Sequence, residues 1–271
     1  SNFLYKSFFT PELSNLMMLN LDKTLKLDLG QLFECVPQLY SLSLANCELD
    51  IITVFQSLHT KPLENLMLLN LSNNKCITSF DTIEFPKNLC RLDINDVTFD
   101  STILSRFFSV FVTKKWAQGM KLSISRIKTD DNGWTKLYQC MHDLKSSTLT
   151  GLTWIGNDID HDSFYHFLKQ CKCLEYLDMS KTFTSQSYDA IHKFSEVLPQ
   201  LPLLKTLILI GNEKNQMKSS IEPIILALEQ NSMLRVLDIR NNLIAPNIFH
   251  YISTLIQHNS TLHTINLDGS V

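Results

Sequence analysis

A nine-residue pattern of apolar and polar positions recurs along the chain. In the copy LRVLDIRNN, which begins at Leu234, apolar residues hold the first, fourth and sixth places and asparagine holds the ninth. Because successive side chains of a strand point to opposite faces, this spacing predicts a short strand that buries Leu237 and Ile239 and ends in a sharp turn. About ten copies can be aligned, and they begin at Leu16, Leu39, Leu66, Leu89, Gly119, Leu149, Leu174, Leu204, Leu234 and Leu262.

The ninth position of the pattern is asparagine or cysteine in half of the copies. Asparagine or cysteine there can hydrogen-bond backbone groups that the turn buries. The residues that fit are Asn74, Asn157, Asn212, Asn242 and Cys47. The residues that depart are Thr24, Val97, Ile127, Thr182 and Ser270. We therefore expect an interrupted row of asparagines.

The segments between the copies predict helices. Apolar residues at offsets 0, 3, 4 and 7 mark one face of a helix. Five segments match, namely 104–111, 134–141, 164–171, 221–228 and 248–255, and 188–198 matches in part. The first copies are only 23 and 27 residues apart, so their outer elements should be short helices or turns.

Repeated strands and helices define the expected fold. About ten copies at a period near 28 residues resemble a leucine-rich-repeat array of the ribonuclease-inhibitor type. The resemblance implies an α/β solenoid, a horseshoe with a concave parallel sheet and convex helices. No linker interrupts the register, so we expect residues 1–271 to form a single leucine-rich-repeat domain. The last copy lacks a covering helix, which suggests a part of a longer protein.

The third, fifth and seventh residues of each copy should point outward from the concave sheet. They are mostly polar in the early copies, whereas apolar residues appear from the sixth copy onward. An apolar patch flanked by charge is typical of a protein-binding surface. The candidate binding residues are Ile155, Tyr176, Asp178, Ile208, Ile210, Val236, Asp238 and Arg240. The alternative is that another segment of a longer chain covers the patch.

The composition of the chain limits the classes of partner that it could bind. A formal net charge of −3 gives no overall positive field to attract nucleic acid. No apolar run approaches the roughly 18 residues needed to span a bilayer, so we expect no direct membrane insertion. Seven scattered cysteines favour a reducing, cytoplasmic location over a disulfide framework. We therefore expect a protein as the partner.

Candidate metal chemistry is confined to one cluster. His161, His166, Cys171 and Cys173 could be imagined as a soft metal site. However, Cys171 already occupies a helical core position, and zinc sites usually leave two to four residues between paired cysteines. We interpret the cluster as core and loop, and we predict neither a metal nor a cofactor.

Catalytic chemistry has no clear motif either. The chain has no phosphate-binding glycine loop and no HExxH or GxSxG sequence. Asp93, Asp178 and Asp238 recur at the fifth position of separate copies. We interpret them as a solvated polar face, because an open sheet offers little desolvation to perturb an acid–base pair. We predict that the protein is not an enzyme.

Two longer stretches carry a family resemblance. Residues 104–111 and 177–220 resemble the leucine-rich-repeat domain of the CARMIL family, scaffolds that regulate actin capping protein. The most specific match is an insertion after a strand that ends in Gly-Asn, with Asn215, Met217, Lys218 and Ser219. The resemblance implies a membrane-binding domain, a dimerisation segment and a capping-protein-binding tail outside these residues. It also implies a scaffold near membranes and the actin cytoskeleton, with actin regulators as partners and homodimerisation through regions outside this segment.

Two other classes of function stay open. The chain could be another cytoplasmic leucine-rich-repeat recognition module, such as a ligand-sensing array or an inhibitor that wraps its target. An enzyme is the third class, and activity that is lost when Asp178 or His166 is changed would revive it.

Overall fold

The computed structural model describes residues 11–146, 148–229 and 231–267. The chain divides into two compact units. Unit 1 consists of the residues up to Phe111 together with Lys115–Lys136, and unit 2 consists of Val112–Lys114 together with the residues from Leu137 onward. A single domain over residues 1–271 therefore stays a prediction.

Unit 1 contains five parallel strands within its described residues, paired in chain order. They are β1 (Met18–Asn20), β2 (Ser41–Ser43), β3 (Leu68–Asn70), β5 (Arg91–Asp93) and β7 (Met120–Ser123). A separate two-stranded sheet pairs β4 (Lys75–Cys76) with β6 (Thr98–Phe99). In β1, β2, β3, β5 and β7 the central leucine of each strand pairs in register with the central leucine of the neighbouring strand. The leucines of these repeats therefore stack into one core.

The helices of unit 1 are short at first and then lengthen. They are the 3-10 helix η1 (Pro11–Asn15), α2 (Leu29–Cys35), α3 (Ile51–Thr60), α4 (Ile103–Thr113) and α5 (Asp131–Met141), of which the last two continue into unit 2. Asp28 and Asp50 cap α2 and α3, because their side chains accept hydrogen bonds from the backbone of the first turn. The expectation of a short outer element is confirmed in the first copy, where α2 has 7 residues, but not in the second, where α3 is a full helix of 10 residues.

A phenylalanine replaces a helix in the copy that begins at Leu66, where the described residues form no helix between β4 and β5. Phe85 is 7% exposed. Its ring centroid lies 4.8 Å from that of Phe55, 5.2 Å from that of Phe111 and 5.6 Å from that of Trp116. We call Phe55, Phe85, Phe111 and Trp116 the Phe85 cluster. It fills the core of a repeat of 23 residues that has no helix among its described residues.

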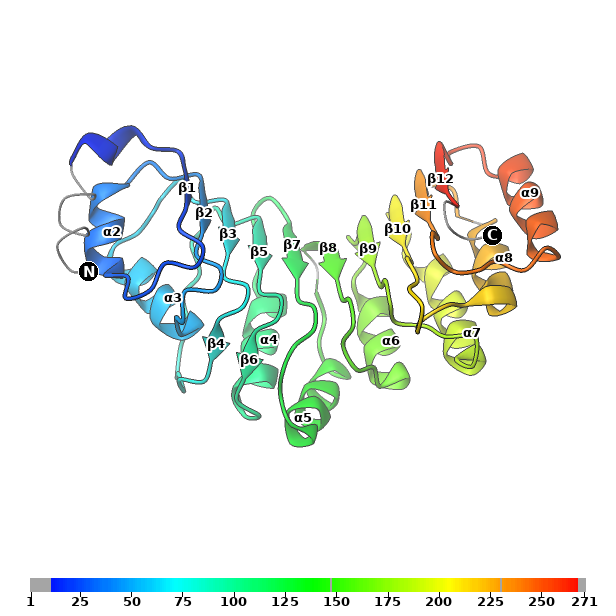
Figure 1. Ribbon diagram of the computed structural model, residues 1–271, viewed down its shortest axis with the longest axis horizontal. Helices are drawn as coiled ribbons and strands as arrows, with labels where there is room; N and C mark the ends of the chain where they lie inside the picture. The colour runs from blue at the N-terminus through cyan, green and yellow to red at the C-terminus, as the bar shows by residue number, and fades with distance from the viewer. Residues whose placement is uncertain (1–10, 147, 230, 268–271) are drawn as a thin grey trace. The chain divides into compact units, whose positions relative to one another are not determined.

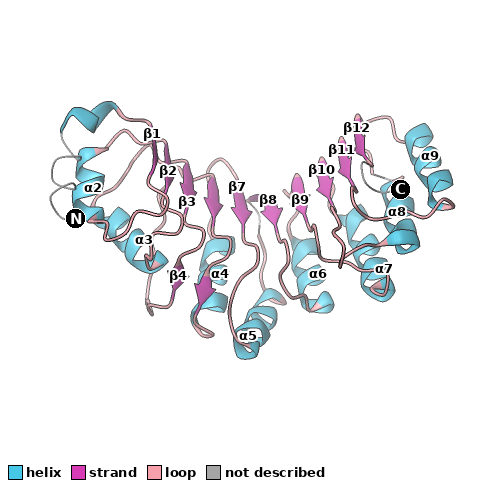
Figure 2. Ribbon diagram, viewed as in Figure 1, coloured by secondary structure: helices cyan, strands magenta, loops and turns pink. Residues whose placement is uncertain are grey.

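Unit 2 also contains five parallel strands within its described residues. They are β8 (Leu149–Thr153), β9 (Tyr176–Asp178), β10 (Thr206–Ile208), β11 (Val236–Asp238) and β12 (Thr264–Asn266). Helices follow the strands and cover one side of the unit (Figures 1 and 2). They are α6 (His161–Gln170), α7 (Tyr188–Val197), η2 (Leu198–Gln200), η3 (Lys218–Ile221), α8 (Glu222–Leu228) and α9 (Ile248–His258).

Strand, turn and helix repeat in both units, so the predicted α/β leucine-rich-repeat solenoid is confirmed. Each of the six segments expected to be helical overlaps one of α4 to α9. The buried faces are the predicted ones, since Phe164, Phe167 and Leu168 of α6 are 0% exposed. The period of 3.6 residues was a reliable signal because each helix packs a single apolar stripe on the sheet.

The turn after the strand has a left-handed backbone at the eighth position. Positive φ angles occur at Lys23, Asn46, Asn73, Asp96, Arg126, Gly156, Lys181 and Asn241. This conformation reverses the chain direction within one residue, and asparagine, aspartate and glycine adopt it most readily. The sharp turn expected from the sequence is therefore built the same way in most repeats.

Two asparagines join neighbouring repeats. The Nδ2 group of Asn74 donates to the backbone oxygen of Leu44 at 2.8 Å, and its Oδ1 accepts from the backbone nitrogen of Cys47 at 3.1 Å. Asn242 does the same in unit 2, donating to Leu209 O at 2.7 Å and accepting from Met217 N at 3.2 Å. Both asparagines are buried, so the role predicted for the ninth position is confirmed at these two places.

Asn212 does not have the predicted core role. Its side chain is half-buried and accepts from the backbone nitrogens of Lys214 and Asn215 at 3.0 and 2.8 Å. Met217, 1% exposed, instead donates to Asn242 as Cys47 donates to Asn74. The insertion of residues 212–216 therefore loops out, and Met217 takes the core position that the sequence pattern assigned to Asn212. Ser270 lies outside the described residues.

Candidate protein-binding site

The eight candidate binding residues all lie in unit 2, on four consecutive repeats. The register of β9, β10 and β11 places Tyr176, Thr206 and Val236 in one row. A second row runs from Asp178 through Ile208 to Asp238. Neighbouring strands lie about 4.8 Å apart, so the side chains of a row are neighbours. We call this surface the unit 2 strand face and define it by Ile155, Tyr176, Asp178, Ile208, Ile210, Val236, Asp238 and Arg240.

The apolar members of this face are half-buried. This holds for all five of them, namely Ile155, Tyr176, Ile208, Ile210 and Val236. The leucines between them, such as Leu207 and Leu237, are 0% exposed. Strand alternation therefore separates a buried core row from a row that keeps part of its apolar surface on the other side of the sheet.

Asp178 is held by its own repeat. Its Oδ1 accepts from the Ser180 hydroxyl at 2.7 Å and from the Ser180 backbone nitrogen at 3.0 Å. The Ser180 hydroxyl in turn accepts from the backbone nitrogen of Ile210 at 3.0 Å. The carboxylate therefore ties its own turn to the next repeat, and only 8% of the residue is exposed.

Asp238 is held by charge. Its carboxylate accepts from Nε and Nη2 of Arg240 at 2.9 and 2.7 Å and from Nδ2 of Asn266 at 3.1 Å. Burial opposes ionisation, but the hydrogen bonds from Arg240 and Asn266 outweigh it and lower the pKa of Asp238 below its ordinary value. Only 4% of the residue is exposed.

The interpretation of these two aspartates as a solvated polar face is wrong. Both carboxylates are buried because they satisfy turn backbone or a paired arginine, and buried carboxylates need such partners. Asp93 in unit 1 is half-buried and pairs with Nε of Arg91 at 3.0 Å. The recurring fifth-position aspartates are thus largely structural.

A charged row at the second position of the pattern was missed from the sequence. Glu175, Lys205 and Arg235 lie next to one another, because each backbone nitrogen donates to the preceding repeat at 2.8 Å. Lys205 pairs with Glu175 at 2.8 Å. The signal was a charge at the same place in three consecutive copies, and it was overlooked because only the third, fifth and seventh positions were assigned to the surface. This row borders the unit 2 strand face.

Unit 1 presents a different strand face. There the polar side chains bond to one another: Asp22 Oδ1 accepts from the Ser43 hydroxyl at 2.6 Å, and Asn70 Nδ2 donates to the same hydroxyl at 2.9 Å. Such a network fixes the polar side chains, while Met18 on β1 is 67% exposed. The polar character predicted for the early copies is confirmed.

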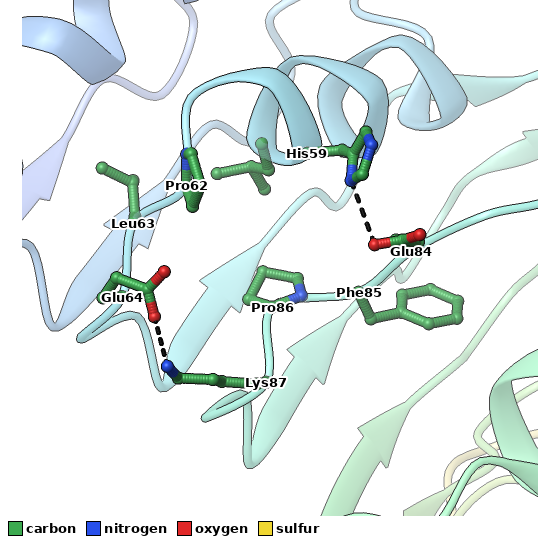
Figure 3. Close-up of a pocket in the computed structure, with 9 residues that line it drawn as sticks. His59, Pro62, Leu63, Glu64, Glu84, Phe85, Pro86 and Lys87 are labelled. Carbon is green, nitrogen blue, oxygen red and sulfur yellow. Dashed lines mark ion pairs between the residues drawn. The ribbon is translucent and has the colours of Figure 1, made fainter.

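A small pocket lies on the helix side of unit 1 (Figure 3). Its volume is about 220 Å³, and Leu58, Leu63 and Phe85 form part of its wall. Two ion pairs stand at its rim: Nδ1 of His59 is 3.0 Å from Glu84, and Nζ of Lys87 is 2.6 Å from Glu64 (Figure 3). Pockets for drug-sized ligands begin at about 300 Å³, so this one is suited to a single side chain.

The histidine and cysteine cluster does not converge on one point. The ring of His166 stacks on that of His142 with centroids 4.6 Å apart. Cys171 is 0% exposed, and burial raises the pKa of its thiol to about 12, which makes it a poor metal ligand. Within the described ranges no three histidine, cysteine or acidic side chains come together in a way that could hold a metal ion.

Among the helices that the structure describes, none has the length and apolar character needed to cross a membrane.

Comparisons with known proteins give the fold alone. No family model and no curated protein matches the sequence.

Several solved structures share the fold. The human trophoblast glycoprotein, Wnt-activated inhibitory factor 1, matches with a TM-score of 0.46 and 14% identity, over 83% of this chain and 78% of its own. A Bacteroides fragilis protein matches with a TM-score of 0.46 and 13% identity, over 87% of this chain and 67% of its own. An internalin of Listeria monocytogenes matches with a TM-score of 0.41 and 17% identity, over 89% of this chain and 70% of its own. At such values a likeness does not extend to partners. By its own repeats and parallel strands, the chain has a leucine-rich-repeat fold, and this fold generally serves as a protein-interaction module.

Proposed function

We propose that the chain is a protein–protein interaction module that binds its partner through the unit 2 strand face. The observation that carries the proposal is the arrangement of three half-buried apolar side chains: Tyr176 and Val236 lie in one row, and Ile208 lies diagonal to both on the strand between them. Binding hot spots are typically aromatic or arginine side chains set among apolar neighbours. Tyr176 and Arg240 lie at the two sides of this apolar group.

The charged residues around the unit 2 strand face indicate which charge the partner should carry. Asp178 and Asp238 are already satisfied by Ser180 and Arg240. By contrast, Lys181 and Arg235 are exposed, and the described residues place no acidic side chain within ion-pair distance of either one. We infer a partner with an apolar anchor flanked by acidic residues, because opposite charges at the rim speed association and fix the register.

The geometry also supports a non-enzymatic role. Asp178 and Asp238 are separated by the strand that carries Ile208, which puts the two carboxylates roughly 10 Å apart at the usual strand spacing. Each is engaged in its own hydrogen bonds. An acid–base pair with coupled pKa values requires closer groups.

The biological setting we propose is regulation of the actin cytoskeleton near membranes, in the cytoplasm. Its support is the resemblance of residues 177–220 to the CARMIL family. The insertion that carries the resemblance is packed into the fold, because Met217 is buried and its backbone nitrogen donates a hydrogen bond to Asn242. The alternative is another cytoplasmic recognition module that senses a ligand or inhibits a target.

The test is affinity capture from a cytoplasmic extract with the immobilised chain and a Tyr176→Ala/Ile208→Lys variant. We expect one or more proteins to be retained by the parent chain and lost with the variant. A control, Ser41→Ala in unit 1, should retain them. Equal retention by the variant contradicts binding through the unit 2 strand face. Retention of one stoichiometric partner without actin regulators favours the alternative setting.

A further inference from the structure

A groove in unit 1 has a row of side-chain amides along it. Its volume is about 710 Å³. Five of its lining residues carry an amide, and each directly precedes the first residue of a repeat: Asn15, Gln38, Asn65, Asn88 and Gln118. The same position in unit 2 carries no amide, but Thr148, Cys173, Leu203, Met233 and Thr261. The amide row is therefore specific to unit 1.

Hydrogen bonds hold part of this row in place. Nδ2 of Asn65 donates to Oε1 of Gln38 at 2.8 Å. Nδ2 of Asn88 donates to the backbone oxygen of Glu64 at 2.7 Å. Each bonded amide retains a further donor hydrogen and acceptor capacity. The row is thus partly ordered before any ligand arrives, which reduces the entropy lost on binding.

The same groove has an apolar floor. Met17, Tyr40 and Met67 are side by side, because Tyr40 N donates to Met17 O at 2.8 Å and Met67 N donates to Tyr40 O at 2.9 Å. Met17 is 61% exposed. Methionine side chains adapt to apolar groups of varied shape. None of the residues that line the groove is charged.

We propose that this groove binds an extended, uncharged peptide segment of a partner protein. A side-chain amide offers one donor group and one acceptor group, as a peptide unit does, so a row of amides complements a main chain. Five rungs span roughly 19 Å at the usual strand spacing, the length of about six extended residues. Alternate side chains of that peptide, about 6.6 Å apart, face the apolar strip that Met17, Tyr40 and Met67 form together. The absence of charge in the lining matches a neutral segment better than a phosphate backbone.

The probe is an immobilised array of uncharged ten-residue peptides with an aliphatic residue at every second position. One matched array carries serine at those positions, and another is methylated at alternate peptide nitrogens. The full chain should be retained by members of the first array, with at least a tenfold weaker signal on the other two. Gln38→Ala/Asn65→Ala and Met17→Ser should each weaken retention at least tenfold at an unchanged melting temperature.

The control is Leu203→Ala, an exposed residue at the equivalent position in unit 2, which should bind like the parent chain. The methylated array tests the proposal even if the double variant fails to fold. Equal binding to methylated and unmethylated peptides overturns it, and so does no retention on any array. Binding of single-stranded oligothymidine, or self-association of the chain, that is lost in Met17→Ser also overturns it, since the occupant would then be a nucleic acid or a second copy.

Discussion

Ile208 on β10 and Asp238 on β11 are direct partners in the parallel register, and Asp178 is the partner of Ile208 on its other side. Ile208→Asp would place three carboxylates on adjacent strands. Like charges directly opposite one another destabilise a sheet, so we expect a loss of about 1–2 kcal/mol in unfolding free energy at neutral pH. Ile208→Lys should cost less, because its ammonium group lies between two carboxylates. Chemical denaturation of both variants measures the difference, and equal losses would contradict the assigned register.

The pairing of Asp238 with Arg240 predicts a pH dependence. The folded-state pKa of Asp238 lies below its ordinary value of 3.8. A carboxyl group whose pKa is lower in the folded state stabilises the fold. This contribution is fully present above the unfolded-state pKa and is lost as the pH falls through the folded-state pKa. Asp238→Asn should therefore be less stable than the parent by about 1 kcal/mol at pH 7. The gap should narrow as the pH falls below 3.8, and a gap that stays constant in denaturant titrations down to that range would contradict the pairing.

Gly211 is required by close backbone approach. A Cβ atom there would lie 2.3 Å from Asn241 O and 2.6 Å from Asn215 O. Gly211→Ala should cost about 2–3 kcal/mol, because backbone atoms must shift to admit the methyl group. Gly30→Ala in α2 is the matched control, since its nearest atom is a side-chain oxygen of Asp28 at 3.5 Å. That substitution should stabilise the helix by about 0.5–1 kcal/mol. Thermal unfolding distinguishes the two, and similar effects would contradict the packing of the insertion.

The Phe85 cluster makes a prediction for unit 1. Phe85→Ala removes a ring that contacts Phe55, Phe111 and Trp116. Truncating a buried phenylalanine usually costs about 3–5 kcal/mol. Ile77→Ala, in the same loop but 48% exposed, should cost less than about 0.5 kcal/mol. Denaturant unfolding followed by tryptophan fluorescence is the measurement, and a loss for Phe85→Ala as small as for Ile77→Ala would show that the loop does not replace a helix.

The sequence predicts most of the architecture because each repeat shows the same two periods. Alternation marks a core leucine such as Leu237, and the helical stripe marks Phe164 and Phe167. These signals are local, and the packing of the repeats enforces them. The roles of Asn74 and Asn242 follow for the same reason, since a buried turn needs a group that can both donate and accept.

The rest depends on contacts between repeats. Asn212 fits the pattern, yet Met217 takes its place, because the insertion closes on Asn242 in the following repeat. Asp178 and Asp238 occupy outward positions but are buried by Ser180 and Arg240. The row of Glu175, Lys205 and Arg235 lies at a position that strand alternation alone does not assign to the surface. Neighbouring turns, absent from any single repeat, decide these cases.

Binding through the unit 2 strand face is tested by measuring affinity and stability on the same variant. A protein retained by the parent chain is titrated calorimetrically against the parent, Tyr176→Ala/Ile208→Lys and Ser41→Ala, and the melting temperature of each is recorded. We expect the double variant to bind at least tenfold more weakly while its melting temperature stays within a few degrees of the parent, and Ser41→Ala to bind as the parent does. Unchanged affinity in the double variant, or a weakening that only accompanies unfolding, would contradict binding through the unit 2 strand face.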